Sequence, residues 1–241
     1  VVLAAGASEP GVLKLEKGEP VNALEFLADF KKHDGNLDLG KNVVVIGGGN
    51  TAMDTARAAK RTKGVEHVYL VYRRTKRYMP ADEEELVMAV EDGVEFKELL
   101  APKAQENGVL LCDVMKLGEM DASGRRGVVA TGETVSVPAD TIIAAVGEKV
   151  PTHFYEACSL NLNDRGKVLV NPDTKESSVK NVYVIGDGLG GPATVVEAIR
   201  DALAASEAIA GRKLVQDFDE KVTSEDVYPR RGSLLETQEG R

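Results

Sequence analysis

The segment NVVVIGGGNTAMDTARAAKR, Asn42 to Arg61, joins an apolar run to a glycine turn and then to a stretch of good helix formers. This order predicts a strand, a tight turn and a helix. A second apolar run, EHVYLVYRR, ends in Arg73 and Arg74. Together they have the length of about 30 residues that is typical of a βαβ unit. The sequence therefore predicts an α/β fold built on a Rossmann-like parallel sheet.

The glycine turn has the spacing G-x-G-x-x-A. In a nucleotide-binding unit, the first glycine permits the tight turn, the second lets the backbone approach a pyrophosphate, and the small third residue lets the helix pack on the sheet. The phosphates would lie at the helix N-terminus, where unpaired N–H groups and the macrodipole favour anions. The turn predicts a dinucleotide site; the alternatives are a turn selected for packing alone or a site for S-adenosylmethionine. Its candidate cofactor-binding residues are Gly47, Gly48, Gly49, Asn50, Thr51 and Ala52.

Two cations, Arg73 and Arg74, occupy the end of the second strand, about 20 residues beyond the turn, where such folds meet the adenosine ribose. A carboxylate at this position accepts hydrogen bonds from the ribose of NAD, but it would repel a 2′-phosphate. Guanidinium groups hold a phosphate through charge-assisted hydrogen bonds. The two arginines, with Arg77 nearby, therefore favour NADP(H) over NAD and over S-adenosylmethionine. The alternative interpretation is a solvated basic strand end.

A second nucleotide-binding signal lies later in the sequence, in NVYVIGDGLGGPATVVEAIRDALAAS, Asn181 to Ser206. This segment predicts a strand ending in Gly186 and Asp187, a flexible turn, and a helix that begins near Thr194. An aspartate at a strand end can accept a hydrogen bond from a sugar or ribityl hydroxyl, and the positive end of a helix would favour a reduced, anionic flavin ring. An ordinary turn or cap role for Asp187 is an equally good interpretation.

The remaining patterns indicate how these units are joined. Strands are expected in residues 1–7 and in ADTIIAAVGE, and helices from Val21 to His33 and in PADEEELVMAVEDG. Residues 109–137 alternate in polarity, with breaks at DASGRRG and TGET, which predicts an antiparallel meander. The chain becomes polar beyond Gly211, where we expect a tail or linker. Because the first strand opens without a methionine, we expect the natural polypeptide to begin earlier.

Composition narrows the classes of function. The 241 residues are 43% hydrophobic and carry a net charge of −9, so nucleic acid is not expected as a general partner. No apolar run approaches the roughly 18 residues needed to cross a bilayer, and we expect a cytoplasmic protein with no membrane partner. Cys112 and Cys158 form no CxxC pair and have no nearby histidine, so neither a metal site nor a disulfide redox centre is expected. No Ser-His-Asp or Cys-His arrangement emerges, and no catalytic residue is assigned.

Four motifs occur in a familiar order: GGGNTAMDTARAAKR, VYRRTKRYMP, DTIIAAVGE and VYVIGDGLGGPATVVEAI. In this order the chain resembles the small subunit of NADPH-dependent glutamate synthase and related FAD/NAD(P)H oxidoreductases. These relatives include the flavin and NADPH half of dihydropyrimidine dehydrogenase and a selenate-reductase-like branch. The segment DVYPRRGSLL resembles the linker that precedes a cysteine cluster in that branch. The similarity covers residues 1 to about 211.

The resemblance implies a domain organisation in which an NADPH domain is inserted into an FAD domain. Residues 1–19 would be the end of the first FAD-domain segment, 20–146 the NAD(P)H-binding domain, 147–211 the C-terminal FAD-domain segment, and 212–241 a polar tail or linker. Ala4, Ala5 and Gly6 would form the first crossover, and Gly147 and Glu148 the second, beside the nicotinamide. Hydride would pass from NADPH to FAD, and electrons then to an iron–sulfur module or partner subunit. The residues implied at the flavin are Gly186, Asp187, Thr194, Val195 and Val196.

The sequence also departs from the family pattern. The first FAD fingerprint, a G-x-G-x-x-G near the family's own N-terminus, is missing, as are the cysteines of the ferredoxin-like modules that commonly flank these subunits. We therefore expect weak or absent FAD binding, and no activity, in this chain alone. A non-catalytic nucleotide-binding assembly module on the same fold is the alternative function.

Overall fold

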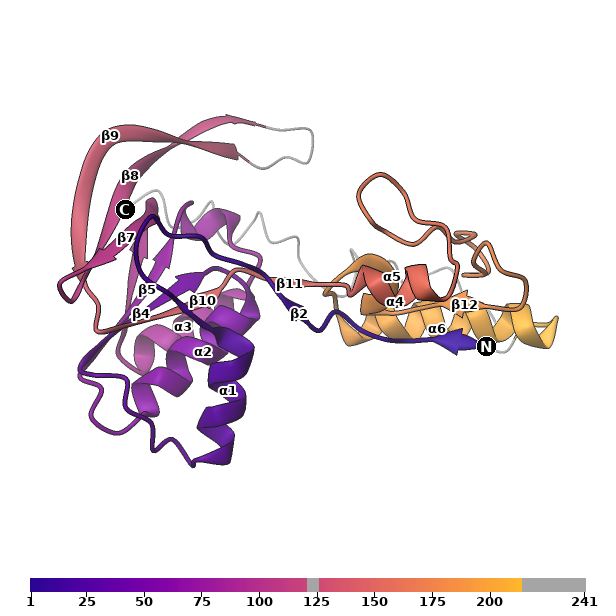
Figure 1. Ribbon diagram of the computed structural model, residues 1–241, viewed down its shortest axis with the longest axis horizontal. Coiled ribbons are helices and arrows are strands. Elements are labelled where there is room, and N and C mark those ends of the chain that lie inside the picture. The colour runs from indigo at the N-terminus through magenta and orange to yellow at the C-terminus, as the bar shows by residue number, and fades with distance from the viewer. Residues whose placement is uncertain (121–125, 214–241) are drawn as a thin grey trace, which may run out of the picture.

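The computed structural model describes residues 1–120 and 126–213, which form two bodies joined by two crossing segments (Figure 1). The larger body is built on a five-stranded, fully parallel sheet in the order β3-β10-β4-β5-β6. This sheet confirms the predicted α/β fold and the strand–turn–helix–strand order. Its strands are β3 (Val21–Asn22), β10 (Thr141–Ala145), β4 (Asn42–Gly47), β5 (His67–Tyr72) and β6 (Val94–Glu98).

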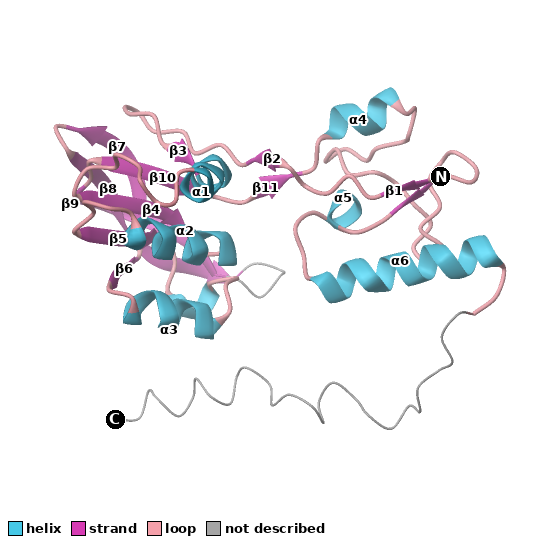
Figure 2. Ribbon diagram, turned by 90° about the horizontal axis from the view of Figure 1, so that it is seen from below, coloured by secondary structure: helices cyan, strands magenta, loops and turns pink. Residues whose placement is uncertain are grey.

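Both faces of this sheet are covered. Helices α1 (Ala23–Lys32), α2 (Asn50–Arg61) and α3 (Glu83–Glu91) pack on one face, and an antiparallel meander of β7 (Leu100–Glu106), β8 (Val109–Met120) and β9 (Arg126–Pro138) packs on the other (Figure 2). Successive residues of β4 alternate between the two cores because strand side chains point to opposite faces. This two-sided burial explains why the strand is a continuous apolar run in the sequence.

The meander begins earlier than the sequence predicts. The prediction placed it at residues 109–137, whereas pairing already starts at Leu100, which lies opposite Val114. β7 has few large apolar side chains and contains Pro102, so its sequence lacks a strong strand signal. The predicted break at DASGRRG falls partly on residues 121–125, outside the described residues.

The smaller body has little regular sheet. β1 (Val2–Leu3) pairs in parallel with β12 (Tyr183–Val184), so both strands predicted here are shorter than expected. Two short helices, α4 (Thr152–Ala157) and α5 (Asp187–Gly190), were not predicted; α5 replaces the flexible turn expected at GLGG. The core of this body consists of Tyr155, Leu160, Val168 and Val184.

Capping explains where the two best-defined helix starts lie. α6 (Val195–Ala210) matches the prediction: Thr194 and Glu197 form a capping box, and Gly211 ends the helix with φ 65°. The helix predicted from Val21 begins two residues later, because β3 pairs with β10 and the Asn22 side chain caps α1.

The two bodies are joined by a short antiparallel pair. β2 (Glu9–Pro10) lies beside β11 (Glu148–Lys149), and the Gly11 N–H donates to the Gly147 carbonyl at 2.7 Å. The chain therefore leaves the smaller body and returns to it side by side (Figure 1). Within the described residues, no helix is long and apolar enough to cross a membrane. The predicted tail lies almost entirely at 214–241, outside the described part of the chain.

Candidate functional site

The glycine turn lies between β4 and α2, at the edge of the sheet where the parallel strands end. A Cβ at Gly47 would collide with the Ala145 carbonyl, and a Cβ at Gly48 would lie 2.5 Å from the Tyr72 ring. Packing within the protein therefore accounts for these two glycines. A Cβ at Gly49 would meet nothing closer than Pro80 at 3.9 Å. Packing alone does not explain the third glycine, which faces open space where a ligand could lie.

Gly49 also begins α2. It is the N-cap residue, and no side chain caps the helix there. The first N–H groups of a helix have no partner within the helix, so those of Asn50 and Thr51 point toward the open side of the turn. An anion at this position would be favoured by both the N–H groups and the helix dipole.

The loop after β5 forms one wall beside the turn. The Ala81 N–H donates to the Gly48 carbonyl at 3.0 Å, and the Asp82 N–H donates to the Asn50 side chain at 3.0 Å. The Asn50 amide is therefore used to fix this loop, which leaves the Asn50 backbone as its available ligand-binding group. Sequence reasoning did not anticipate this wall.

A hydrogen bond joins the turn to the segment that returns to the smaller body. The Thr51 hydroxyl donates to the Glu148 carboxylate at 3.1 Å, across 97 residues of sequence. Gly147, the preceding residue, accepts the Gly11 N–H. The structure thus brings together Thr51, Gly147 and Glu148, which the sequence assigned to separate motifs.

Four cations follow β5: Arg73, Arg74, Lys76 and Arg77. Arg73 is exposed and directly follows Tyr72, whose ring packs on Gly48, so the strand end lies next to the glycine turn. Arg74 is half-buried, and its Nε donates to the Arg126 carbonyl at 2.9 Å.

None of these four cations forms an ion pair with a carboxylate of the described residues. By contrast, Arg57 and Arg61 of α2 both bind Asp92, at 2.8 and 2.7 Å. Unlike the helix arginines, the cations at the strand end therefore remain available to an external anion.

The residues assigned to a flavin lie in the smaller body. Gly186 has φ 65°, and Asp187 accepts the Ala193 N–H with Oδ1 at 3.1 Å. This bond gives Asp187 the turn role that the sequence left open, and within the described residues its other carboxylate oxygen has no hydrogen-bond partner. Hydrogen bonds from Thr194 hold the pKa of Glu197 below its ordinary value, so a carboxylate already occupies the first turn of α6.

Val195 and Val196, the first two residues of α6, are exposed. The smaller body therefore holds Gly186, Asp187, Thr194, Val195 and Val196 together, apart from the glycine turn and the arginines. Gly147 and Glu148 lie at the junction between these two groups of predicted residues (Figure 1).

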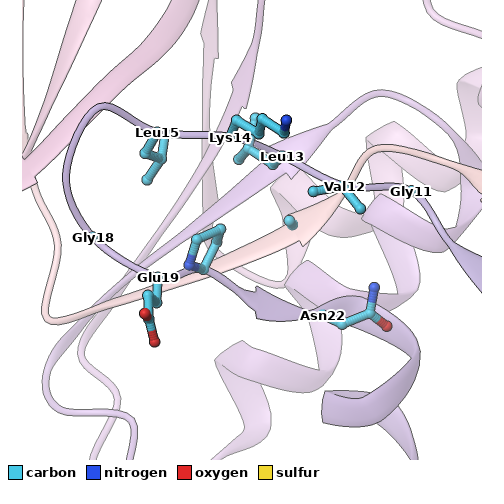
Figure 3. A pocket seen from close by; sticks show the side chains of 10 residues that line it. Gly11, Val12, Leu13, Lys14, Leu15, Gly18, Glu19 and Asn22 are labelled. Atoms are coloured by element: carbon cyan, nitrogen blue, oxygen red, sulfur yellow. The ribbon is translucent and has the colours of Figure 1, made fainter.

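Two hollows border the larger body. An apolar groove of about 400 Å³ lies between α3 and the loop after β5, with Met79, Leu86 and Phe96 in its wall and Lys76 and Arg77 at its edge. A more open groove of about 440 Å³ lies between residues 11–15 and 18–22 (Figure 3). No sequence pattern indicated either groove, because each depends on how separate segments pack against one another.

Both cysteines are unpaired. Burial raises the pKa of the Cys112 thiol to about 12, which makes it a poor nucleophile, and Cys158 is exposed. The described residues contain no group of three or more His, Cys, Asp or Glu side chains placed to hold a metal ion.

Comparison with known proteins extends these observations. The family model described as pyridine nucleotide-disulphide oxidoreductase matches residues 1–202. YgfK of Escherichia coli (strain K12) is 39% identical over 243 residues, covering 97% of this chain and 23% of that protein. The glutamate synthase [NADPH] small chain of Azospirillum brasilense is 37% identical over 211 residues, covering 80% of this chain and 43% of that protein. The chain thus spans less than half the length of these relatives.

A solved structure of Mycobacterium tuberculosis FprA in complex with NADPH has a TM-score of 0.69 and 19% sequence identity, covering 87% of this chain and 63% of that one. This likeness supports the fold. The similarity to glutamate synthase small chains, predicted from four ordered motifs, is confirmed. The chain belongs to the pyridine nucleotide-disulphide oxidoreductase family.

Proposed function

We propose that this chain supplies an NADPH-binding domain and part of an FAD-binding domain to a larger flavoprotein oxidoreductase. The NADPH domain would comprise residues 20–146, and the FAD-domain segments residues 1–19 and 147–211. The observation that carries the proposal is the group of four cations, without an ion pair among the described residues, next to a glycine turn with room for a ligand. The name of the Azospirillum brasilense relative, glutamate synthase [NADPH] small chain, supports the same cofactor.

The pyrophosphate of NADPH would bind at the start of α2. Gly49 leaves space for it, and the backbone N–H groups of Gly49, Asn50 and Thr51 would donate to its oxygens. Gly47, Gly48 and Ala52 would shape the turn by allowing close packing.

The 2′-phosphate would bind to the arginines after β5. Arg73 is exposed and unpaired within the described part of the chain, and Arg74 keeps its terminal N–H groups because only Nε is used by the Arg126 carbonyl. Charge-assisted hydrogen bonds to a phosphate dianion are stronger than those to a neutral ribose hydroxyl. This difference would select NADPH over NADH.

The nicotinamide would lie toward Gly147 and Glu148, at the junction of the two bodies. The Thr51–Glu148 hydrogen bond ties the pyrophosphate-binding turn to this junction, so the two ends of the cofactor site would be positioned together. When bound in this arrangement, the two cofactors would supply hydride-transfer chemistry, with NADPH as donor and FAD as acceptor. This chain's residues would hold and orient the two cofactors.

On the flavin side, the second carboxylate oxygen of Asp187 would accept a ribityl hydroxyl, and Thr194, Val195 and Val196 would border the pyrimidine edge. Gly186 would allow the sharp turn that presents Asp187. These contacts are few, so FAD should bind weakly or not at all to this chain. An iron–sulfur module or partner subunit would receive the electrons in the complete enzyme.

Titration calorimetry with NADPH and NADH tests the cofactor assignment. Loss of charge-assisted bonds to the phosphate should cost on the order of 1.5–3 kcal/mol, so we expect about tenfold to hundredfold preference for NADPH. The Arg73→Ala, Arg74→Ala double variant should lose that preference, and Lys63→Ala, which removes an exposed cation after α2, should keep it. Equal affinities for both cofactors in the unmodified chain would contradict the assignment.

An absorption experiment tests the flavin assignment separately. Little yellow flavin should survive gel filtration of the chain mixed with FAD. With FAD in excess and oxygen removed, bleaching by NADPH would favour the oxidoreductase function. Bound NADPH without any bleaching in a longer protein that retains FAD would favour the non-catalytic assembly module.

A further inference from the structure

The β8–β9 hairpin reaches back to the end of β5. Beyond the part paired with β7, the two strands continue together from the Met115–Ala130 pair to the Met120–Arg126 pair. Figure 1 shows this portion as a curved arm beside the sheet. We call residues 115–120 and 126–130 the arm.

Arg74 holds the arm at two places. Its backbone carbonyl accepts the Leu99 N–H at 3.2 Å, and the Leu99 carbonyl accepts the Met115 N–H at 2.8 Å, which fixes the base of the arm. Its Nε donates to the Arg126 carbonyl at 2.9 Å, which fixes the start of β9. These bonds place Arg126 beside Arg74 although 52 residues separate them in sequence.

Arg126 adds a fifth cation to the four that follow β5. It is exposed and, like the others, forms no ion pair with a carboxylate of the described residues. The acid fixed beside the group, Glu98, accepts the Lys76 backbone N–H at 3.0 Å. In a chain with a net charge of −9, these five cations, which have no ion pair among the described residues, form a local positive field that favours a bound anion.

We propose that Arg126 is a further specificity-determining residue, which reaches the 2′-phosphate of NADPH from the arm. This inference rests on the proposed function. Arg74 would contribute in two ways: its Nε positions the arm, and its terminal N–H groups would donate hydrogen bonds to the phosphate. Arg73 and Arg126 then approach the same anion from β5 and from the arm, which suits a phosphate with several acceptor oxygens.

Titration calorimetry at low salt with two small probes tests the role of Arg126. The probes, 2′,5′-adenosine diphosphate and 5′-adenosine monophosphate, differ only in the 2′-phosphate. Arg126→Ala should weaken the diphosphate about three- to tenfold and leave the monophosphate unchanged. Arg126→Lys should recover part of the loss, and Lys63→Ala should change neither affinity.

The outcomes separate this inference from the proposed function. If the unmodified chain does not prefer the diphosphate, the 2′-phosphate assignment falls, and the role of Arg126 with it. If Arg126→Ala keeps the full preference, or weakens both probes equally, the role of Arg126 alone is wrong.

A double-mutant cycle tests the positioning role of Arg74. The measured quantity is the fold-loss of affinity for 2′,5′-adenosine diphosphate. Because Arg74 fixes the arm, the fold-losses from Arg74→Ala and Arg126→Ala should combine to less than their product in the double variant. The fold-losses from Arg73→Ala and Arg126→Ala should multiply. Circular dichroism would verify that each variant is folded. Fully multiplicative losses for the Arg74 and Arg126 pair would show that the arm keeps its place without Arg74.

Discussion

The two bodies of this protein bury their apolar side chains to very different degrees. α2, with 12 residues, buries six of them between the sheet and its neighbours. α6 is longer, with 16 residues, yet it buries only Asp201 and Ala205. Its residues Val195, Val196 and Ile199 are 76%, 74% and 61% exposed. The larger body is therefore organised by layered packing and the smaller one by local contacts.

Polar contacts supplement the small apolar core of the smaller body. The Tyr155 hydroxyl donates to the Gly188 carbonyl at 3.0 Å, and Lys175 lies 3.3 Å from the buried Asp201 carboxylate. A buried ion pair contributes less net stability than a well-packed apolar core, because both charges lose their hydration. Changes to packing should therefore be felt most in the larger body.

Creating a cavity in each core by a Leu→Ala substitution should give the largest difference between the bodies in free energy of unfolding. Leu70 is fully buried within β5, and Leu70→Ala should lower the free energy of unfolding by about 2–5 kcal/mol. Leu160, in the smaller core, is 6% exposed, and Leu160→Ala should cost about 2 kcal/mol, the lower end of this range, because few other buried residues share its core. Urea unfolding followed by far-UV circular dichroism measures both, since the chain has no tryptophan. An equal or larger loss from Leu160→Ala would contradict the contrast between the bodies.

The glycine turn offers a sharper test within the larger body, since packing and ligand binding can be separated there. Gly48→Ala should destabilise the fold by about 1–3 kcal/mol, because the new methyl group would press on the Tyr72 ring. Gly49→Ala should cost less than about 1 kcal/mol, because its φ of −97° suits any residue and the space is open. It should nevertheless weaken NADPH at least tenfold, since the methyl group would fill the space assigned to the pyrophosphate.

Calorimetric titration and thermal unfolding of the same two variants measure these effects. The prediction fails if Gly49→Ala binds NADPH as tightly as the unmodified chain. It also fails if the two substitutions destabilise the fold equally, because the two glycines would then have one role.

Local sequence signals predicted the larger body better than the smaller one. The β4–turn–α2–β5 order follows from periodicity and turn chemistry within a few neighbouring residues, and it is confirmed. In the smaller body, the predicted start of α6 near Thr194 is also confirmed. β7, α4 and α5 were missed because their sequences are polar or short.

Local sequence signals also predicted only part of the candidate site. Motifs located the glycine turn, but the Thr51–Glu148 and Arg74–Arg126 bonds join residues 97 and 52 positions apart. Such pairings depend on how the strands are ordered and paired, which no local pattern contains. The assignments of individual residues to cofactors therefore remain predictions.

The bond between Thr51 and Glu148 should have an intermediate effect, because it links the bodies rather than building either one. Thr51→Ala should lower stability by about 0.5–1.5 kcal/mol and leave the half-buried Glu148 carboxylate without this donor. Thr51→Ser keeps the hydroxyl and should retain most of the stability. Thermal unfolding of both variants measures the difference. A loss in Thr51→Ser as large as in Thr51→Ala would show that the methyl group matters rather than the hydrogen bond.

Low pH should produce the smallest difference in stability between the two bodies. Asp140 accepts the backbone N–H groups of Asn42 and Lys41 at 2.8 and 2.9 Å, where β4 begins. These bonds hold the pKa of Asp140 below the ordinary value of 3.8, and the bond from the Asn42 N–H has the largest effect. A carboxyl group whose pKa is lowered by folding stabilises the fold above its unfolded pKa, and that contribution is lost as the pH falls through the folded pKa. The larger body should therefore lose stability below about pH 4.

Asp140→Asn isolates this effect because it keeps an acceptor oxygen but cannot titrate. The variant should be slightly less stable at neutral pH, by less than about 1 kcal/mol because the site is exposed, and its stability should fall less steeply below pH 4. Glu197, whose pKa is lowered by Thr194 in the other body, is untouched by the substitution and should keep its own acid response. Hydrogen exchange measured at pH 3 and pH 6 reports the two bodies separately. Asp140 would not be the source of the acid response if the variant and the unmodified chain lost protection equally in the larger body.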